Sequence, residues 1–150
     1  MTDRDALDVL RDQVLDGASL EDGDDVLDLG DGSGLLAGEL RARIGDGWVY
    51  AVARDVGTLE KLLRSAHEQG IAGVAYLVGD PDVLPLPDAS VDVVVGGGVF
   101  TGTGAGAGAA RELYRVLRPG GRLSLVEGDG LADAVGALRD AGFVDEPRVA

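Results

Sequence analysis

Short apolar runs and amphipathic segments alternate along the chain. Five runs have the length and apolar content of buried β-strands: residues 24–29, 48–52, 74–78, 91–96 and 122–127. The segments between them repeat apolar residues every three or four positions, which is the spacing of a helix that buries one face. Helices are therefore expected over residues 4–16, 34–44, 56–69 and 131–141, with another before the stop-and-turn signal RPGG at 118–121.

The same spacing predicts which side of each helix faces the core. The residues expected to point inward are Leu7, Leu10 and Val14; Leu36, Leu40 and Ile44; Leu59, Leu62, Leu63 and Ala66; Ala109, Leu113, Val116 and Leu117; and Leu131, Ala134, Val135, Leu138 and Ala141. Gly142 is placed to end the last helix.

Strands that alternate with helices predict an α/β fold with a doubly wound, mostly parallel sheet. The chain of 150 residues is expected to form a single domain over 1–150, with an N-terminal helix in 1–20 and the core in 24–145. Ligands of such sheets bind outside the carboxyl ends of the strands. The functional residues are therefore expected in the segments that follow the strands.

Composition narrows the choice of partners. The formal net charge of −14 repels phosphate backbones and anionic lipid surfaces, so neither a nucleic acid nor a membrane is an expected partner. With no cysteine, the chain has no disulfide and no thiolate metal site, and no metal is expected. The start of the chain lacks a signal-peptide profile, which favours a cytoplasmic protein. A salt-rich cytoplasm and a GC-rich genome both remain open as origins of the acidity.

Three glycines follow the first expected strand in the pattern D-x-G-x-G-x-G, from Asp28 through Gly30 and Gly32 to Gly34. Glycine lets the backbone turn tightly and approach a ligand without a Cβ in the way. The pattern differs from the dinucleotide fingerprint G-x-G-x-x-G, whose third glycine would fall at Leu35. A nicotinamide enzyme is therefore disfavoured.

This glycine motif resembles that of the class I S-adenosylmethionine-dependent methyltransferases, in particular the small-molecule branch related to quinone-biosynthesis enzymes. Three further segments carry the likeness: VGDPDVLPLPDASVDVVVGGGVF at 78–100, ARELYRVLRPGGRLSLVE at 110–127 and LRDAGF at 138–143. The resemblance covers roughly residues 25–145. It implies a Rossmann-like sheet of the class I methyltransferase type and S-adenosylmethionine as cofactor.

The resemblance also implies roles for matching residues. Gly30, Gly32 and Gly34 would bring backbone against the ribose and the methionine portion, and Asp28 would take the methionine ammonium. Asp80 would accept a hydrogen bond from the adenine amino group, and Gly96 would lie beside the methionine moiety.

The sequence departs from the family pattern at the end of the second strand. Family members carry an acid there that binds both ribose hydroxyls, and this chain has Ala53. Arg54 and Asp55 follow, and both are kept as candidate cofactor-binding residues. Asp55 has two interpretations, as a replacement ribose ligand or as the N-cap of the helix over 56–69.

Candidates for acid–base catalysis are few. Glu127, at the end of the fifth strand, is a weak candidate, and Thr101 and Thr103 are weaker ones. The only histidine, His67, lies on the 56–69 helix and is expected to be a surface or packing residue. Catalysis would then rest on positioning of the acceptor.

The C-terminal strand pair of the family is expected to be incomplete, which leaves the fifth strand as an open edge that a second copy could cover. A homodimer through that edge is therefore predicted. Two functions stay open: a methyltransferase acting on a small molecule, and a catalytically inactive methyltransferase-like protein with a binding, regulatory or scaffold role.

Overall fold

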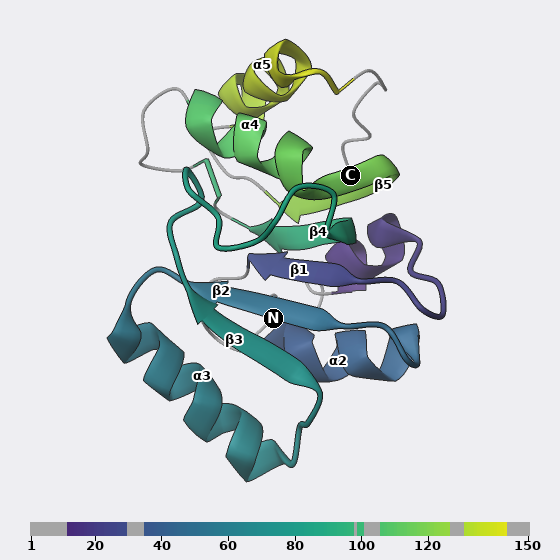
Figure 1. The fold of residues 1–150 in the computed structure, drawn as a ribbon. Coiled ribbons are helices and arrows are strands. Elements are labelled where there is room, and N and C mark those ends of the chain that lie inside the picture. The colour runs from purple at the N-terminus through teal and green to yellow at the C-terminus, as the bar shows by residue number, and fades with distance from the viewer. Residues whose placement is uncertain (1–11, 30–34, 98, 101–105, 127–130, 144–150) are drawn as a thin grey trace, which may run out of the picture.

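Five parallel strands form the centre of the protein in the computed structural model, which describes residues 12–29, 35–97, 99–100, 106–126 and 131–143 (Figure 1). The strands are β1 (Val26–Leu29), β2 (Val49–Ala53), β3 (Val74–Val78), β4 (Val91–Gly97) and β5 (Leu117–Val126). Their order across the sheet is β3-β2-β1-β4-β5, and every pair of neighbours is parallel. The doubly wound parallel sheet predicted from the sequence is confirmed.

Helices cover the sheet on both faces, each over its own apolar cluster. They are α2 (Leu35–Ile44), α3 (Val56–Gln69), α4 (Ala107–Val116) and α5 (Leu131–Ala141), preceded by helical residues 12–18. On one face, residues 12–18 and α2 bury Leu15, Leu40 and Ile44 against Val26, Val49 and Val93. On the other, α4 buries Leu113 and Val116 against Leu27 and Val94. The alternation of inward and outward residues along each strand produces this division.

One aspartate and one glycine fix the ends of two helices as predicted. Asp55 is the N-cap of α3, and its carboxylate accepts a hydrogen bond from the Thr58 N–H at 2.7 Å. Gly142 has a φ of +122°, and the N–H groups of Gly142 and Phe143 donate to the carbonyls of Arg139 and Leu138. This pair of hydrogen bonds is typical of a helix that ends at a glycine with positive φ.

Leu7 and Leu10 lie outside the described residues. Of the described residues that were expected to point inward, two large ones are exposed. Leu63 is 46% exposed and Leu131 is 37% exposed. In α3 the buried residues are Leu62 and Ala66, four positions apart, and Leu63 lies a hundred degrees further round the helix. The sequence predicted too wide an apolar stripe, because β3 is the edge of the sheet and offers α3 little surface to cover.

The RPGG sequence is part of β5 and does not separate α4 from the strand, so the expected start at residue 122 was wrong. Leu117 pairs with Val91 and Arg122 pairs with Val93, so the residues between them bulge out of register. Arg118 in this bulge donates to Asp25 at 2.9 Å and to Asp92 at 3.0 Å. These ion pairs hold the bulge against the amino ends of β1 and β4.

The connection from β3 to β4, residues 79–90, contains no helix, unlike the connection from β2 to β3, which the structure also describes in full and which contains α3. Its leucines Leu84 and Leu86 are buried in the cluster beneath α4. Across the described ranges, no helix is both long and apolar enough to cross a membrane.

Candidate functional site

The carboxyl ends of β1, β2, β3 and β4 lie along one edge of the sheet because all the strands are parallel. The predicted site residues that the structure describes are Asp28, Arg54, Asp55, Asp80 and Gly96, and each lies at or just after one of these strand ends. Gly30, Gly32, Gly34, Thr101, Thr103 and Glu127 lie outside the described residues. Their assignments stay predictions.

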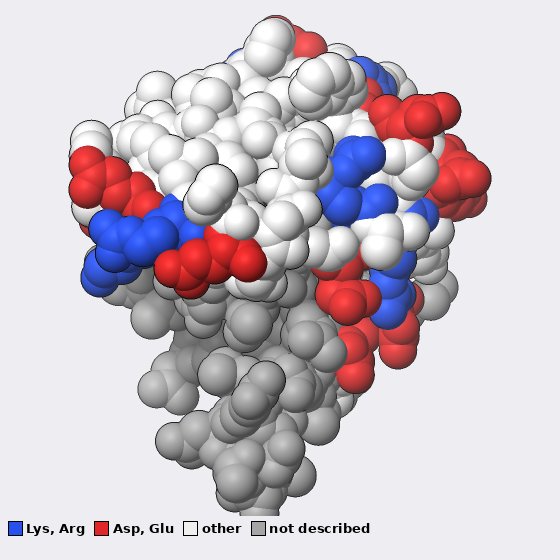
Figure 2. Space-filling view, turned by 90° about the horizontal axis from the view of Figure 1, so that it is seen from below, with Lys and Arg blue, Asp and Glu red and all other residues white. Residues whose placement is uncertain are grey.

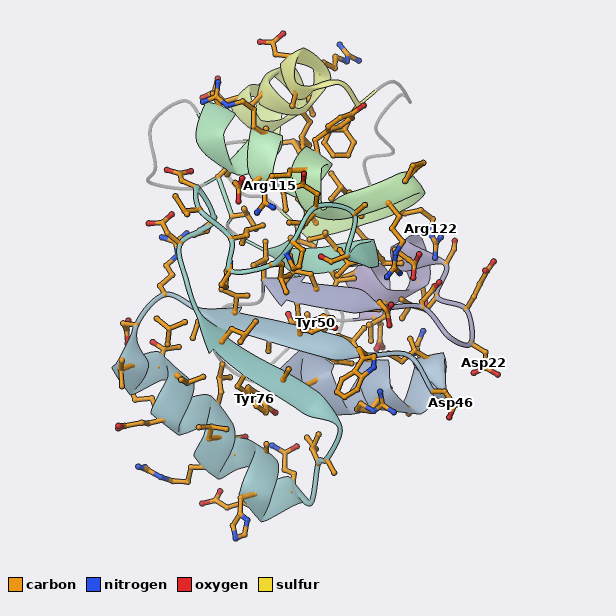
Figure 3. The ribbon with its side chains drawn as sticks, in the orientation of Figure 1. Asp22, Asp46, Tyr50, Tyr76, Arg115 and Arg122 are labelled. Atoms are coloured by element: carbon orange, nitrogen blue, oxygen red, sulfur yellow. The ribbon has the colours of Figure 1, made fainter. Side chains whose placement is uncertain are left out.

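Asp28 is buried near the end of β1, with a side chain that is 6% exposed. Register pairs Asp28 with Ala51 and Ala51 with Tyr76, so the three side chains share one face of the sheet. Burial raises the pKa of Tyr76, and the negative charge of Asp28 raises it further (Tyr76 is labelled in Figure 3). The carboxylate therefore places negative charge directly before the glycine motif.

Gly96 allows β4 to approach β1 closely where both strands end. It pairs with Leu29, and a Cβ on Gly96 would lie 2.5 Å from the Leu29 carbonyl oxygen. No side chain fits at that distance, so glycine is required here for strand packing. Its predicted place beside the cofactor is compatible with this structural role.

The end of β2 has no free carboxylate beside the strand. Ala53 is buried, and its carbonyl accepts from the Gly79 N–H at 2.9 Å. Asp55 caps α3, and the hydrogen bond from the Thr58 backbone holds the pKa of Asp55 below its ordinary value. Arg54 is exposed. Ala53 thus stands where the resemblance implies an acid, and the exposed Arg54 follows it.

Asp80 sits in a tight turn just beyond β3. Its Oδ1 accepts from the Asp82 N–H at 2.9 Å, and its carbonyl accepts from the Val83 N–H at 2.9 Å. The residue is exposed, and Oδ2 has no hydrogen bond to any described residue. One carboxylate oxygen is therefore available to a donor such as an exocyclic amino group.

Two residues of α4 that the sequence analysis did not single out hold the segment after Asp80. Glu112 accepts from the Leu84 N–H at 2.7 Å and from Nε and Nη2 of Arg115, each at 2.7 Å. Arg115 also donates to Asp88 at 2.8 Å, and Figure 3 shows it reaching from α4 toward this segment. The one signal in the sequence was an acid and a base three positions apart on an amphipathic helix, a common surface pattern.

His67 lies outside the site, as expected. It is exposed in the last turn of α3, whereas Asp55, at the strand-end side, begins that helix. The length of the helix therefore separates the imidazole from the strand ends.

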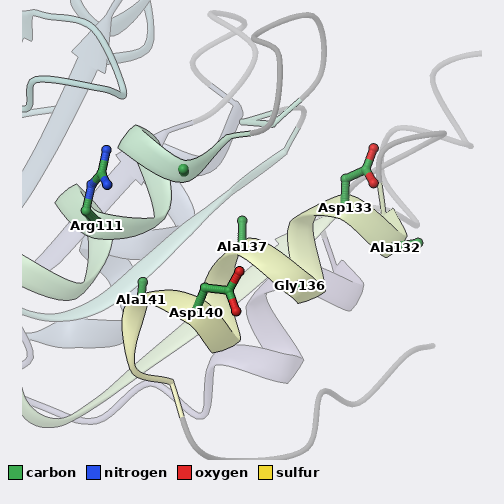
Figure 4. A pocket seen from close by; sticks show the side chains of 8 residues that line it. Arg111, Ala132, Asp133, Gly136, Ala137, Asp140 and Ala141 are labelled. Carbon is green, nitrogen blue, oxygen red and sulfur yellow. The ribbon is translucent and has the colours of Figure 1, made fainter.

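A groove of about 540 Å³ lies between α4 and α5 (Figure 4). Small residues, among them Ala107, Ala132 and Gly136, line it together with Arg111 and Asp140. None of the predicted cofactor-binding residues lines this groove. It is a separate feature of the helical layer.

Comparisons with known proteins agree with this geometry. The methyltransferase domain family matches residues 27–125. Malonyl-[acyl-carrier protein] O-methyltransferase of Methylococcus capsulatus is 40% identical over 99 residues, which are 66% of this chain and 35% of that protein. Ubiquinone/menaquinone biosynthesis C-methyltransferase UbiE of Stenotrophomonas maltophilia is 35% identical over 113 residues, 73% of this chain and 44% of that protein.

The chain thus spans less than half the length of these two curated relatives. Among solved structures, a methyltransferase from Aquifex aeolicus described as dependent on S-adenosylmethionine has a TM-score of 0.76 at 23% identity. The match covers 95% of this chain and 89% of that one, and at this identity it shows the fold. Together the matched domain, the relatives and the fold show that the chain belongs to the class I S-adenosylmethionine-dependent methyltransferase family.

Proposed function

We propose that the protein is an S-adenosylmethionine-dependent methyltransferase that acts on a small molecule. The observation that carries the proposal is the joint placement of Asp28 and Asp80 at the ends of β1 and β3, on either side of the end of β2. A buried carboxylate suits an ammonium group, and a free carboxylate oxygen suits an exocyclic amine. The two ends of the cofactor carry these groups.

The described residues fit the cofactor at two of its three parts. Asp28 would hold the ammonium, Asp80 would accept from the adenine amino group, and Gly96, at the end of β4 beside the end of β1, would lie next to the methionine portion. When bound, S-adenosylmethionine supplies an electrophilic methyl carbon on a sulfonium, and the sulfur keeps the electron pair of the broken bond. At the ribose, Ala53 supplies no acceptor.

The role of the protein in the reaction is to position the acceptor in line with the methyl group. Acceptors that are already nucleophilic, such as an activated carbon, a nitrogen or a sulfur, need no base beyond solvent for the released proton. Glu127 remains the candidate base for a hydroxyl acceptor. The proposal includes a cytoplasmic location. It also includes the absence of a nucleic-acid partner, which the net charge of −14 supports.

Calorimetric titration with S-adenosylmethionine and S-adenosylhomocysteine, in low and in molar salt, tests the proposal. We expect a dissociation constant in the micromolar range, weakened at least tenfold in Asp28→Asn because the ammonium loses its counter-charge. Asp46→Asn is the matched control, since Asp46 is an exposed acid at the other edge of the sheet (Figure 3). Absence of binding at millimolar ligand in both salts would refute the proposal.

Turnover separates the two functions that the sequence left open. Binding followed by methyl transfer to acceptors from a small-molecule panel identifies an enzyme. Tight binding without transfer to any acceptor would favour a binding or regulatory protein, and the replacement of the ribose acid by Ala53 is the observation that favours this second function.

The proposal also includes a homodimer through β5. Among the described strands β5 pairs only with β4, so no described strand covers its other edge, and natural proteins usually cover open edges. Sedimentation velocity from micromolar to near-millimolar protein should show a mass that rises to twice that of the chain. A monomer at every concentration and salt would contradict this part of the proposal.

A further inference from the structure

One face of α4 lies against residues 82–90 of the connection between β3 and β4. Gly108, Glu112 and Arg115 are spaced four and three residues apart, which places them on one side of the helix. All three contact residues 82–88, and the Arg115 and Val116 carbonyls accept from the N–H groups of Ala89 and Ser90 at 2.9 and 2.8 Å. The connection is therefore held against α4 by contacts that run from Asp82 to Ser90.

Leu84, four residues after Asp80, is hydrogen-bonded to α4 side chains through both of its backbone polar groups. The Leu84 N–H donates to Oε2 of Glu112 at 2.7 Å, and the Leu84 carbonyl accepts from Nη2 of Arg115 at 3.2 Å. Both backbone groups of one residue are thus held by a single ion pair. This pair replaces the helix or ladder bonds that the connection lacks.

The contact continues toward Asp80 at the first turn of α4. A Cβ on Gly108 would lie 3.1 Å from Oδ1 of Asp82, so the helix backbone abuts the residue whose N–H binds Asp80. Asp80 itself is exposed, and its hydrogen bonds to described residues all lie within its own turn. The turn is held at its start by Gly79, whose N–H donates to the Ala53 carbonyl at 2.9 Å, and on its far side by what holds residues 82–84.

Glu112 is the centre of this arrangement and Asp88 is peripheral. The Glu112 side chain is 17% exposed and binds Arg115 through both oxygens, whereas the Asp88 side chain is 81% exposed. The hydrogen bonds from Arg115 hold the pKa of Glu112 below its ordinary value. Glu112 is consequently charged at neutral pH, and charge-assisted bonds of this kind are stronger than neutral ones.

We propose that Glu112, together with Arg115, is a positioning residue for adenine recognition: it holds residues 82–84 so that the free oxygen of Asp80 meets the adenine amino group. The inference rests on the proposed function, since it takes Asp80 as the adenine contact. Neither Glu112 nor Arg115 touches the cofactor in this arrangement. Their effect passes through the backbone of Leu84 and the Asp80 turn.

Titration of two ligands tests the inference: S-adenosylhomocysteine and its 6-desamino analogue, a purine riboside that lacks only the amino group. In Glu112→Gln the dissociation constant of S-adenosylhomocysteine should rise about tenfold, the value of one charge-assisted hydrogen bond. That of the desamino analogue should stay unchanged. In an Asp80→Ala background, Glu112→Gln should have no further effect on either ligand.

Matched variants separate positioning from a general loss of stability. Arg111→Gln removes a charge from the same helix on the side of the groove, and Asp88→Asn removes the outer partner of Arg115. Both should bind S-adenosylhomocysteine like the unchanged protein. Arg115→Lys keeps the charge but loses the bidentate contact with Glu112. Its affinity for S-adenosylhomocysteine should fall less than that of Glu112→Gln, and again only for the ligand with the amino group. This variant keeps the test valid even if Glu112→Gln folds poorly.

Three results would overturn the inference. An unchanged affinity in both Glu112→Gln and Arg115→Lys would show that Asp80 is held without them. An equal loss for both ligands, or a loss in Asp88→Asn as large as in Glu112→Gln, would assign Glu112 a structural role. In each of these the proposed function stands. If the unchanged protein binds neither ligand, the proposed function fails and the inference with it.

Discussion

At the scale of single residues, Ala53 offers a gain-of-affinity experiment. Its side chain lies at the end of β2, on the same face of the sheet as Ala51 and Asp28. Ala53→Asp should lower the dissociation constant of S-adenosylhomocysteine about tenfold, because a carboxylate there can accept from the ribose hydroxyls. The variant should also be less stable, since Ala53 is 3% exposed and the new charge is partly desolvated.

Ala53→Asn is the control for Ala53→Asp, because it has the same shape without the charge and should gain less. The 2′-deoxy form of the ligand should gain less than the full ribose. Equal or weaker binding by Ala53→Asp would mean that Arg54 or Asp55 has taken over ribose recognition, or that the ribose lies elsewhere.

The residues predicted correctly from the sequence are those whose role depends on near neighbours. Asp55 as an N-cap needs only the three residues after it, and Gly142 only the turn before it. Glu112 could not be predicted, because its partner Leu84 lies 28 positions away and no local pattern joins them. Whether Asp28, Asp80 and Gly96 bind the cofactor stays a prediction, although the structure places each of them at a strand end.

At the scale of elements, α5 carries a glycine that its position does not require. Gly136 lies inside the helix, and a Cβ built there meets nothing within 4 Å. Gly136→Ala should therefore raise the free energy of unfolding by about 0.5–1 kcal/mol, since glycine loses more backbone freedom on folding than alanine. Urea denaturation at neutral pH measures the change.

Gly70→Ala is the matched substitution with the opposite sign. Gly70 ends α3 with a φ of +70°, where an alanine side chain is strained. The variant should be destabilised by about 1–2 kcal/mol. A stabilised Gly70→Ala or a destabilised Gly136→Ala would contradict the helix ends as described.

Strand and helix order followed from the sequence because each element shows its own periodicity. The boundary between α4 and β5 did not, since RPGG carries turn residues that the sheet accommodates as a bulge. In the bulge Arg118 pairs with Asp25, just before β1, and with Asp92 in β4. Such a contact forms only once the sheet brings these segments together, so the sequence around RPGG does not reveal it.

At the scale of the whole molecule, stability should fall in acid, and Glu112 makes a definable contribution to the fall. The pKa of Glu112 in the folded protein lies below its ordinary value of 4.5. The unfolded chain therefore binds the proton first, so this stabilisation is full above about pH 4.5 and is lost as the pH falls through the folded pKa. Denaturation curves from neutral pH to about pH 3 should slope less steeply in Glu112→Gln.

Asp88→Asn is the control for this slope, because Asp88 is the exposed partner of Arg115. Its curve should run parallel to that of the unchanged protein. Equal slopes for the unchanged protein and Glu112→Gln would show that the ion pair does not form in solution.

The acidity of the chain gives the widest prediction. Figure 2 shows the charged side chains of one face, acidic and basic, gathered at its two flanks around a largely uncharged area. A net charge of −14 on one domain opposes the compact state through self-repulsion. Salt screens this repulsion, since the Debye length falls from ~30 Å at 0.01 M to ~10 Å at 0.1 M. The melting temperature should therefore rise with sodium chloride.

Screening also weakens the ion pairs within the structure. Whether the melting temperature rises or falls with salt depends on which is screened more, the repulsion between acids or these ion pairs. Asp24 and Asp25, bound by Arg122 and Arg118, have side chains that are only 11% and 20% exposed, so salt reaches these pairs poorly. The exposed acids are fully accessible to salt, so their mutual repulsion is screened at lower salt than the ion pairs are. Most of the rise should accordingly occur below about 0.2 M and then level off. Asp46→Lys makes the net charge less negative by two units. The variant should have a higher melting temperature in low salt and a smaller increase with added salt. A melting temperature that falls with salt would show that the ion pairs, and not the excess of acids, dominate the electrostatics of this protein.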